Sequence, residues 1–309
     1  MKMKQIPLIA LGIALVILVS GCVNQQKVTV APNDGLAIVE FDAEAQSFSN
    51  DEPVPLYLNI ENQGGTTASN VVAEILGASW VGGPVAESIG TMSPPDLTIK
   101  PPVPGQFEIY TPVLDAYSKL PEGVVANIDL TARVSYDYAS NGQVTVYVLN
   151  KEEYRRRMQT NKEVPATKDV QNSYGPIHID IDERGLSPIV AESTPGETKE
   201  VAVTIYIKNV GSGAPITDDV VGKMSVNLEL QGSGAQFEEC MGSRTYISGD
   251  MTSATLPITL RRGEQYTIPC KVTVSTPTTT DAFSILFRTN YRYFVEQPKT
   301  ITIIGAPES

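Results

Sequence analysis

The sequence predicts an all-β fold of two tandem antiparallel β-sandwiches. Apolar and polar residues alternate over long stretches of both halves, and clusters of Gly, Pro, Asn and Ser separate these stretches. Similar short motifs also recur in the same order in the two halves. These observations divide the chain into segments 1–21, 22–34, 35–149, 150–174 and 175–305, which we interpret in this order.

Residues 1–21 are predicted to be a lipoprotein signal peptide. Lys2 and Lys4 precede an uncharged run at 6–19 whose 14 residues suit a signal peptide but are few for a membrane span, which needs about 20. The run ends in Val-Ser-Gly before Cys22, which resembles a lipobox. We expect Cys22 to carry a lipid and residues 22–34 to act as a tether. The rest of the chain is then expected to lie outside the membrane. The alternative is an uncleaved signal anchor, which gives the same orientation.

The charge balance makes nucleic acid an unsuitable partner. The chain carries a formal net charge of -12, and removing the two signal lysines leaves -14. With Cys22 lipidated, Cys240 and Cys270 remain, and outside the cell we expect them to form a disulfide. The alternative is two unrelated buried thiols.

The first sandwich is predicted from alternation at 54–61 and over the twelve residues 127–138. Asn141-Gly142 then interrupts the pattern before an apolar run at 144–149. An Asn-Gly pair between two alternating runs predicts a tight hairpin.

The second sandwich repeats this plan, with alternation at 201–208 and 283–293 and a turn at Gln297-Pro298. Residues 60–64 (IENQG) match 207–211 (IKNVG), and 133–138 (RVSYDY) match 288–293 (RTNYRY), at offsets of 147 and 155. We interpret the two halves as a duplication of one domain, with tyrosine rings in the core near the end of each long strand.

A short helix and a flexible linker are predicted to join the halves at 150–174. Asn150 can cap the helix, and Glu153 stands three residues later, as in a capping box. The basic triplet at 155–157 is interpreted as a solvated helix face that pairs with Glu152 and Glu153.

The stretches LNIENQG at 58–64 and IYIKNVG at 205–211, together with the Ala/Ser-rich stretch at 66–72, resemble the second strand of CARDB-type archaeal surface domains. The resemblance covers both halves and implies Ig-like sandwiches on an archaeal cell surface, without an activity. The chain departs from that pattern in a Pro-rich stretch at 94–104, which either covers a sheet edge or forms a binding loop.

The search for catalytic or metal-binding groups centres on the single histidine. His178, Asp180 and Asp182 alternate along a predicted strand and so project from one face. They could form a metal or acid–base site, but we favour a charged edge strand that resists aggregation. Calcium could instead bind to Asp180, Asp182 and Glu183, or to Asp218 and Asp219, but both candidates are weak because no loop gathers six oxygens. We therefore expect no enzyme activity, no cofactor and no bound metal.

Trp80 is the remaining binding candidate. As the single tryptophan, it could stack on a sugar, or it packs a loop. We expect a non-enzymatic, membrane-anchored extracytoplasmic protein with an adhesive, envelope-structural or scaffolding role, whose partner is another envelope protein or a surface polymer. The alternative is a carbohydrate- or peptide-binding module that uses the loops of the first sandwich.

Overall fold

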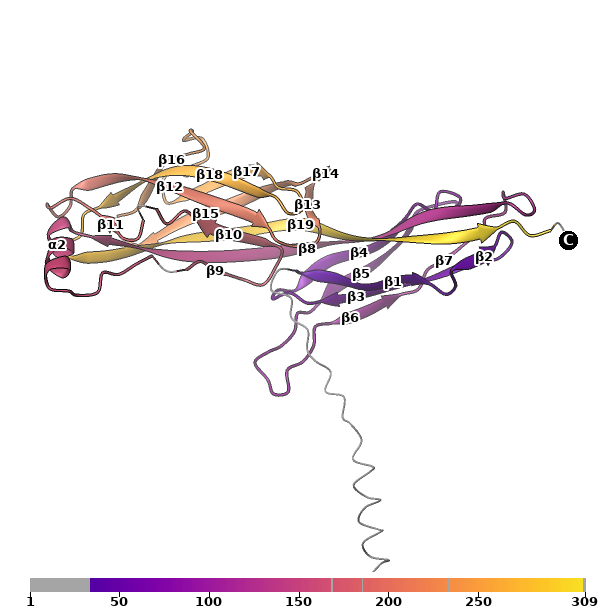
Figure 1. Cartoon of the computed structure of the whole chain (residues 1–309). Helices are drawn as coiled ribbons and strands as arrows, with labels where there is room; N and C mark the ends of the chain where they lie inside the picture. The colour runs from indigo at the N-terminus through magenta and orange to yellow at the C-terminus, as the bar shows by residue number, and fades with distance from the viewer. Residues whose placement is uncertain (1–33, 168, 185, 233, 308–309) are drawn as a thin grey trace, which may run out of the picture.

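The computed structural model describes residues 34–307, except for 168, 185 and 233. The predicted signal peptide, Cys22 and nearly all of the tether therefore lie outside the described residues. The described chain forms an elongated rod with a helix at one end and the C-terminal end of the last strand at the other (Figure 1).

The rod consists of two β-sandwiches, which confirms the predicted all-β fold. Sandwich 1 packs the β1-β3-β6 sheet, with β7, against one half of an 11-stranded sheet, and sandwich 2 packs the β10-β12-β18-β16 sheet against the other half. The strands of sandwich 1 are β1 (Leu36–Ala43), β2 (Ser47–Ser49), β3 (Val54–Asn62), β4 (Ala68–Leu76), β5 (Val85–Met92), β6 (Phe107–Tyr110) and β7 (Val113–Leu114). Those of sandwich 2 are β9 (Gln171–Asn172), β10 (Ile177–Ile181), β11 (Ile189–Val190), β12 (Thr198–Asn209), β13 (Ala214–Thr217), β14 (Val220–Val221), β15 (Lys223–Gly232), β16 (Gln236–Cys240), β17 (Ser253–Thr259) and β18 (Gln265–Ser275).

Two long strands run through both sandwiches and join them. β8 (Val125–Leu149) and β19 (Thr280–Ile304) have 25 residues each and pair antiparallel over their whole length. The first part of β8 pairs with β4 in sandwich 1, and the first part of β19 pairs with β15 in sandwich 2. We call this pair of strands the ribbon. Each strand begins in its own repeat and ends in the other one.

The hairpin predicted at Asn141-Gly142 is therefore wrong, and so is the turn at Gln297-Pro298. β8 continues through Gly142, which pairs with Phe287, and β19 continues through Pro298, which pairs with Thr131. Gly142 is needed for close approach instead of for a turn. A Cβ at this position would lie 2.3 Å from Ile179 Cγ2.

The strand pairing supports the predicted duplication. In both sandwiches a strand near the start pairs with the next strand but one along the chain (β1 with β3, β10 with β12), and a short strand pairs parallel to the far end of the ribbon (β2 with β19, β11 with β8). Asp137 and Arg292 are the middle residues of the two long strands and pair with each other. The repeats are thus related by an approximate two-fold axis at this pair, and β16 is an addition in sandwich 2.

The predicted helix is present as α2 (Lys151–Gln159), and the Asn150 side chain accepts a hydrogen bond from Glu152 N. Glu153 uses its carboxylate for ion pairs with Arg156 and Arg157, both at 2.7 Å, in place of the reciprocal capping-box bond. The expected position of this segment is wrong. α2 lies at the far end of sandwich 2, and the chain then returns along β8, where Ser173 N donates to Asn141 O (Figure 1). The joint between the sandwiches is the ribbon and not a flexible linker.

Candidate functional site: the junction of the two sandwiches

Four tyrosines on one face of the ribbon form a closed cluster at the junction. In the register of the strands Tyr136 faces Tyr293 and Tyr138 faces Tyr291. Neighbouring ring centroids lie 5.8 to 6.4 Å apart in tilted or edge-on geometry. All four rings are buried. Alternation in the sequence placed these rings in the core but did not bring the two pairs together.

The tyrosine hydroxyls hold one turn from each sandwich. Tyr138 Oη accepts from Thr66 N at 3.1 Å, and Tyr293 Oη accepts from Gly213 N at 3.1 Å. Tyr293 Oη also donates to Asn209 Oδ1 at 2.8 Å. The cluster therefore ties the ribbon to the turn that follows β3 and to the turn that follows β12.

These two turns share one hydrogen-bond pattern, which explains the repeated Asn-x-Gly motif. Asn62 Nδ2 donates to Thr66 O and Met92 O, and its Oδ1 accepts from Gly64 N. Asn209 makes the equivalent bonds to Gly213 O, Arg261 O and Gly211 N. Both asparagines are buried. The motif that suggested a family resemblance is thus a turn-forming device.

Burial keeps the tyrosine cluster uncharged. Desolvation raises the pKa of Tyr136 and of Tyr291 well above the usual value of 10, and it also raises the pKa values of Tyr138 and Tyr293. A buried phenol has no solvent to stabilise a phenolate. The cluster therefore acts as neutral packing and hydrogen-bonding material in the physiological pH range.

The opposite face of the ribbon at the junction carries ion pairs. Arg292 Nη1 lies 3.2 Å from Asp137 Oδ1, at the two-fold axis, and Arg292 Nη2 donates to Ser135 Oγ at 2.9 Å. Arg133 lies over the ring of Phe294, 5.0 Å from its centroid, and 2.6 Å from Glu296 Oε1. These ion pairs are partly exposed, so they add little to stability. Their geometry fits the observed register of the two strands.

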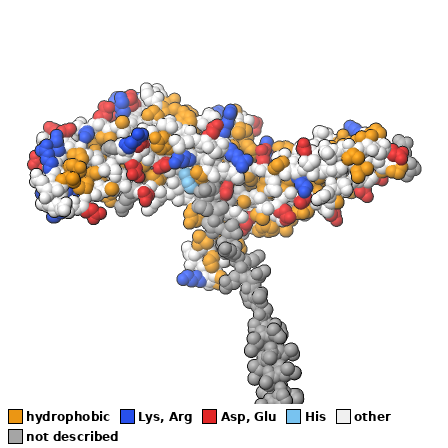
Figure 2. Space-filling view, viewed as in Figure 1, with side chains coloured by type: hydrophobic (Ala, Val, Ile, Leu, Met, Phe, Trp, Pro, Cys, Tyr) orange, Lys and Arg blue, Asp and Glu red, His pale blue; other side chains and the backbone are white. Residues whose placement is uncertain are grey.

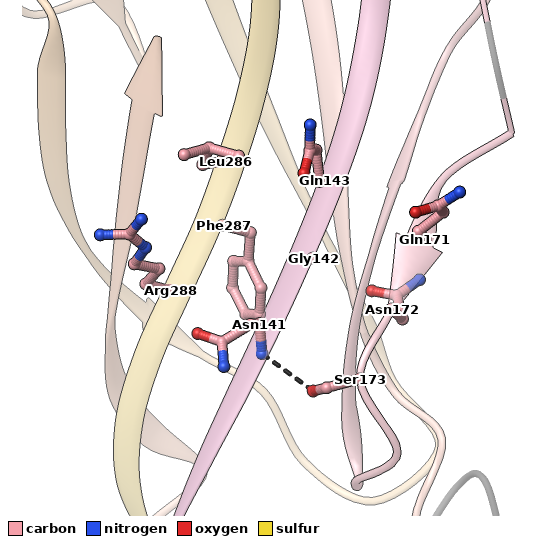
Figure 3. A pocket seen from close by; sticks show the side chains of 9 residues that line it. All are labelled: Asn141, Gly142, Gln143, Gln171, Asn172, Ser173, Leu286, Phe287 and Arg288. Atoms are coloured by element: carbon pink, nitrogen blue, oxygen red, sulfur yellow. Dashed lines mark hydrogen bonds between the residues drawn. The ribbon is translucent and has the colours of Figure 1, made fainter. Parts of the chain in front are cut away.

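A shallow hollow of about 510 Å³ lies beside this junction, where β9 meets the ribbon (Figure 3). Its wall is rich in amides and hydroxyls, and Ser173 Oγ accepts from Asn141 N at 3.0 Å. Arg288 is its one ionisable lining residue. Such a surface can hydrogen-bond a polar ligand, but it brings together no acid–base pair and no nucleophile with a base.

Trp80 is half-buried, in the loop after β4. Its indole N–H donates to Asp115 O at 2.7 Å, and its ring meets Tyr117 edge-on with centroids 5.2 Å apart. Ring and N–H both fasten the 78–81 loop to residues 115–117. This is the loop-packing alternative for Trp80.

His178 and Asp180 project outward from β10, an edge strand of its sheet, as the alternation predicted. Both carboxylates of the proposed site are ion-paired: Asp180 lies 2.5 Å from Lys208 Nζ and Asp182 lies 2.5 Å from Arg184 Nη2. The hydrogen bonds from Arg184 lower the pKa of Asp182 to about 2. These carboxylates are satisfied by cations of the chain itself.

Asp218 and Asp219 form the two-residue turn between β13 and β14, both at positive φ (50° and 60°), and Asp218 lies 3.3 Å from Lys223 Nζ. The two positive φ values are those of a type I′ turn, in which Asp is tolerated. Across residues 34–307, apart from the three undescribed positions, no group of three or more His, Cys, Asp or Glu side chains could hold a metal ion.

Cys240 and Cys270 form a disulfide, as predicted. They are directly paired across β16 and β18, with Cα atoms 4.1 Å apart. The bridge fastens β16, a strand without a counterpart in sandwich 1, to β18 in the interior of the second sheet.

Among the described residues no helix has the length and apolar character to cross a bilayer. Cys22 lies outside the described residues.

No protein-family model and no curated protein matches the chain. Among solved structures it is similar to a red sea bream transglutaminase (10% identity, 87% of this chain and 31% of that chain, TM-score 0.21). It is also similar to an Escherichia coli alpha-2-macroglobulin (8% identity, 87% and 23%, TM-score 0.22) and to a Salmonella alpha-2-macroglobulin (7% identity, 89% and 16%, TM-score 0.19). The chain spans at most about a third of the length of these proteins. Likeness at these TM-scores says nothing about the site or the activity.

Proposed function

We propose that this chain is a membrane-anchored extracytoplasmic protein that acts without catalysis, as a stiff scaffold for another envelope protein or a surface polymer. The observation that carries the proposal is the ribbon, which fuses two sandwiches into one rod. The lipobox-like stretch before Cys22, the Cys240–Cys270 disulfide and the resemblance to CARDB-type surface domains agree with it.

Stiffness is the property that distinguishes this rod from ordinary tandem domains. Domains joined by a linker move relative to each other unless their interface is large. Bending this rod at the junction would break the ladder between β8 and β19 around Asp137 and Arg292 and expose the four buried tyrosines. A rod of this kind holds its two ends at a fixed separation, which is what a scaffold or spacer requires.

The alternative, a carbohydrate- or peptide-binding module, has less support. The indole N–H of Trp80 is already donated to Asp115 O, and the ring contacts Tyr117 edge-on. A ligand would have to compete with both contacts.

Substitution of Cys22 tests the anchor. Wild-type chain expressed in its own host should stay with membranes after a high-salt wash and should show a mass increase from acyl chains at Cys22. Cys22→Ser should lack that mass and remain with an uncleaved leader, whereas Ser118→Ala, a substitution at an exposed loop position of sandwich 1, should behave as wild type. A wild-type chain with unmodified Cys22 would contradict the anchor.

The scaffold role is tested separately by crosslinking in intact cells. Wild-type chain should give one reproducible crosslinked neighbour from positions on the rod, and the absence of any reproducible neighbour would contradict the scaffold role. Turnover of small-molecule or polymer substrates by the purified chain would contradict a role without catalysis.

A further inference from the structure

The described chain enters the rod beside the base of the Pro-rich loop at residues 94–104. The start of β1, the end of β3 and the start of β6 share one end of their sheet, because the three strands pair antiparallel. Gln63 N donates to Gly35 O at 2.9 Å, and Asn62 N donates to Gln106 O at 3.0 Å. The entry point and the base of the loop are therefore neighbours across β3.

This entry point lies at the middle of the rod and not at an end. Asp34 Oδ1 accepts from Ser212 N at 3.2 Å, so the first described residue of the chain touches sandwich 2 as well as sandwich 1. The loop projects sideways from the same region (Figure 1). A tether that ends at Asp34 would therefore be attached to the middle of the rod.

The loop presents an apolar tip. All nine residues at 96–104 are exposed, and the side chains of Leu97, Ile99 and Val103 are 49%, 47% and 46% exposed. The rest of the tip is proline apart from three polar residues, and Figure 2 shows it as a mainly orange projection with blue at its end. Apolar side chains gathered on a projecting tip indicate a contact surface.

The tip is held in shape by its own bonds. Asp96 and Val103 exchange two backbone hydrogen bonds of 3.0 Å across the neck of the loop. Thr98 N and Oγ1 both donate to Asp96 Oδ1, at 2.8 and 2.7 Å. The Asp96 carboxylate is thus hydrogen-bonded at the neck. The prolines restrict the backbone conformation of the tip. Little order has to be gained when the tip binds.

Charge favours a lipid surface as the occupant. The tip carries Lys100 and no carboxylate beyond Asp96 at the neck, although the chain as a whole has a net charge of -12. Aliphatic side chains beside one lysine suit the boundary of a bilayer, where the lysine reaches the headgroups and the aliphatic groups enter the acyl region. An acidic body is held off by an anionic membrane, so the tip is the part that can approach it.

The length of the predicted tether also favours a lipid surface as the binding partner of the tip. Asp34 lies twelve positions after Cys22, and a chain of this length reaches about 40 Å at most. A lipid on Cys22 would therefore keep the tip within reach of the bilayer. We propose that residues 97–103 insert into the outer face of the membrane, so that the rod lies along the surface and is held at its middle by two contacts. The position of the rod, but not the affinity of the tip, rests on the proposed anchor.

A fluorescent probe can report this insertion. With Cys22 acylated and Cys240 bridged to Cys270, Ile99→Cys supplies one free thiol for an environment-sensitive dye in the full-length chain. Val220→Cys, in sandwich 2 and 50% exposed, is the matched control. In phosphatidylcholine–phosphatidylglycerol vesicles the dye at position 99 should shift to shorter wavelength and be quenched by doxyl groups on the acyl chains, whereas the dye at position 220 should do neither. Equal emission from the two positions, without quenching, would overturn the proposal.

A second measurement separates failure of the tip from failure of the anchor. The Cys22→Ser chain, produced without the leader at 1–21, should still bind these vesicles at high lipid concentration. Ile99→Ser in that background should lower its partition coefficient about three- to tenfold, because about half of the side chain leaves water on insertion. Val220→Ser should leave it unchanged. If Cys22 carries no lipid but Ile99→Ser still weakens binding, the anchor fails and the tip stands. If Ile99→Ser has no effect, or if only a protein partner protects the dye at position 99, the tip proposal is wrong whatever Cys22 carries.

Discussion

Removing one hydroxyl from the tyrosine cluster should weaken both sandwiches together. Tyr293→Phe leaves the ring in place but deprives Gly213 N of its acceptor, whereas Asn209 Oδ1 keeps its bond from Gly211 N at 3.2 Å. Leaving a buried N–H without a partner costs about 1 to 3 kcal/mol. We expect the free energy of unfolding to fall by about 2 kcal/mol.

The matched control is Tyr136→Phe. Its hydroxyl is buried and, among the described residues, makes no hydrogen bond of normal geometry, with only a weak contact to the Leu36 backbone. Its removal should change the free energy of unfolding by less than about 0.5 kcal/mol. The two variants lose the same atom from facing positions of the ribbon, so the difference between them isolates the hydrogen bonds.

The assay is equilibrium unfolding in urea, followed by circular dichroism and by the fluorescence of Trp80. Trp80 is the single tryptophan and lies in sandwich 1, whereas Gly213 belongs to sandwich 2. Because the ribbon joins the sandwiches, Tyr293→Phe should shift the Trp80 transition as much as the whole-chain transition. A shift in circular dichroism with an unchanged Trp80 transition would refute the coupling.

Three further predictions concern the buried tyrosines, the disulfide and the close approach at Gly142. The buried tyrosines have pKa values raised above 10, so their contribution to stability is complete below pH 10 and is lost as the pH rises above it; urea titrations should show a fall of up to about 1.4 kcal/mol per pH unit for each tyrosine. Cys240→Ala combined with Cys270→Ala opens a loop with a sequence separation of 30 and should cost about 3 to 4 kcal/mol, measured against wild type without reductant. Gly142→Ala puts a Cβ 2.3 Å from a buried isoleucine and should cost about 1 to 3 kcal/mol, whereas Gly82→Ala meets nothing within 4 Å and should be close to neutral; equal thermal stability of these two variants would contradict the close approach at Gly142.

Local physics made much of the fold predictable. Alternation identified the strands because inward and outward side chains differ in polarity, and Asn150 identified the start of α2 because its side chain caps the first turn. The duplication was visible because both copies retain Asn62 and Asn209 to bind the same turn.

The course of the long strands could not be predicted in this way. Asn141-Gly142 has the composition of a hairpin turn, and Gln297-Pro298 has that of a loop, yet both lie within extended strands. The first half of each long strand pairs with the second half of the other, at sequence separations from 131 (Leu149 with Thr280) to 179 (Val125 with Ile304) residues. Local propensity cannot distinguish folding back on itself from this exchange, which resembles domain swapping within one chain.

The candidate sites were predicted unevenly for a similar reason. The disulfide followed from cysteine count and compartment, but the loop at 94–104 gave only two alternatives, since composition does not tell whether apolar residues are covered. Its exposure, and its position beside Gly35, come from pairing among β1, β3 and β6.

The most direct test of the fused rod is a distance along β8. Spin labels at Asn127→Cys and Thr145→Cys, in a chain whose other cysteines are acylated or bridged, stand 18 residues apart on one strand. A continuous strand places them about 60 Å apart. Pulsed electron–electron double resonance should give one narrow distribution of distances between the labels, centred near this value. A hairpin at Asn141-Gly142 would bring the labels to about 35 Å; that value, or a broad distribution, would contradict the ribbon.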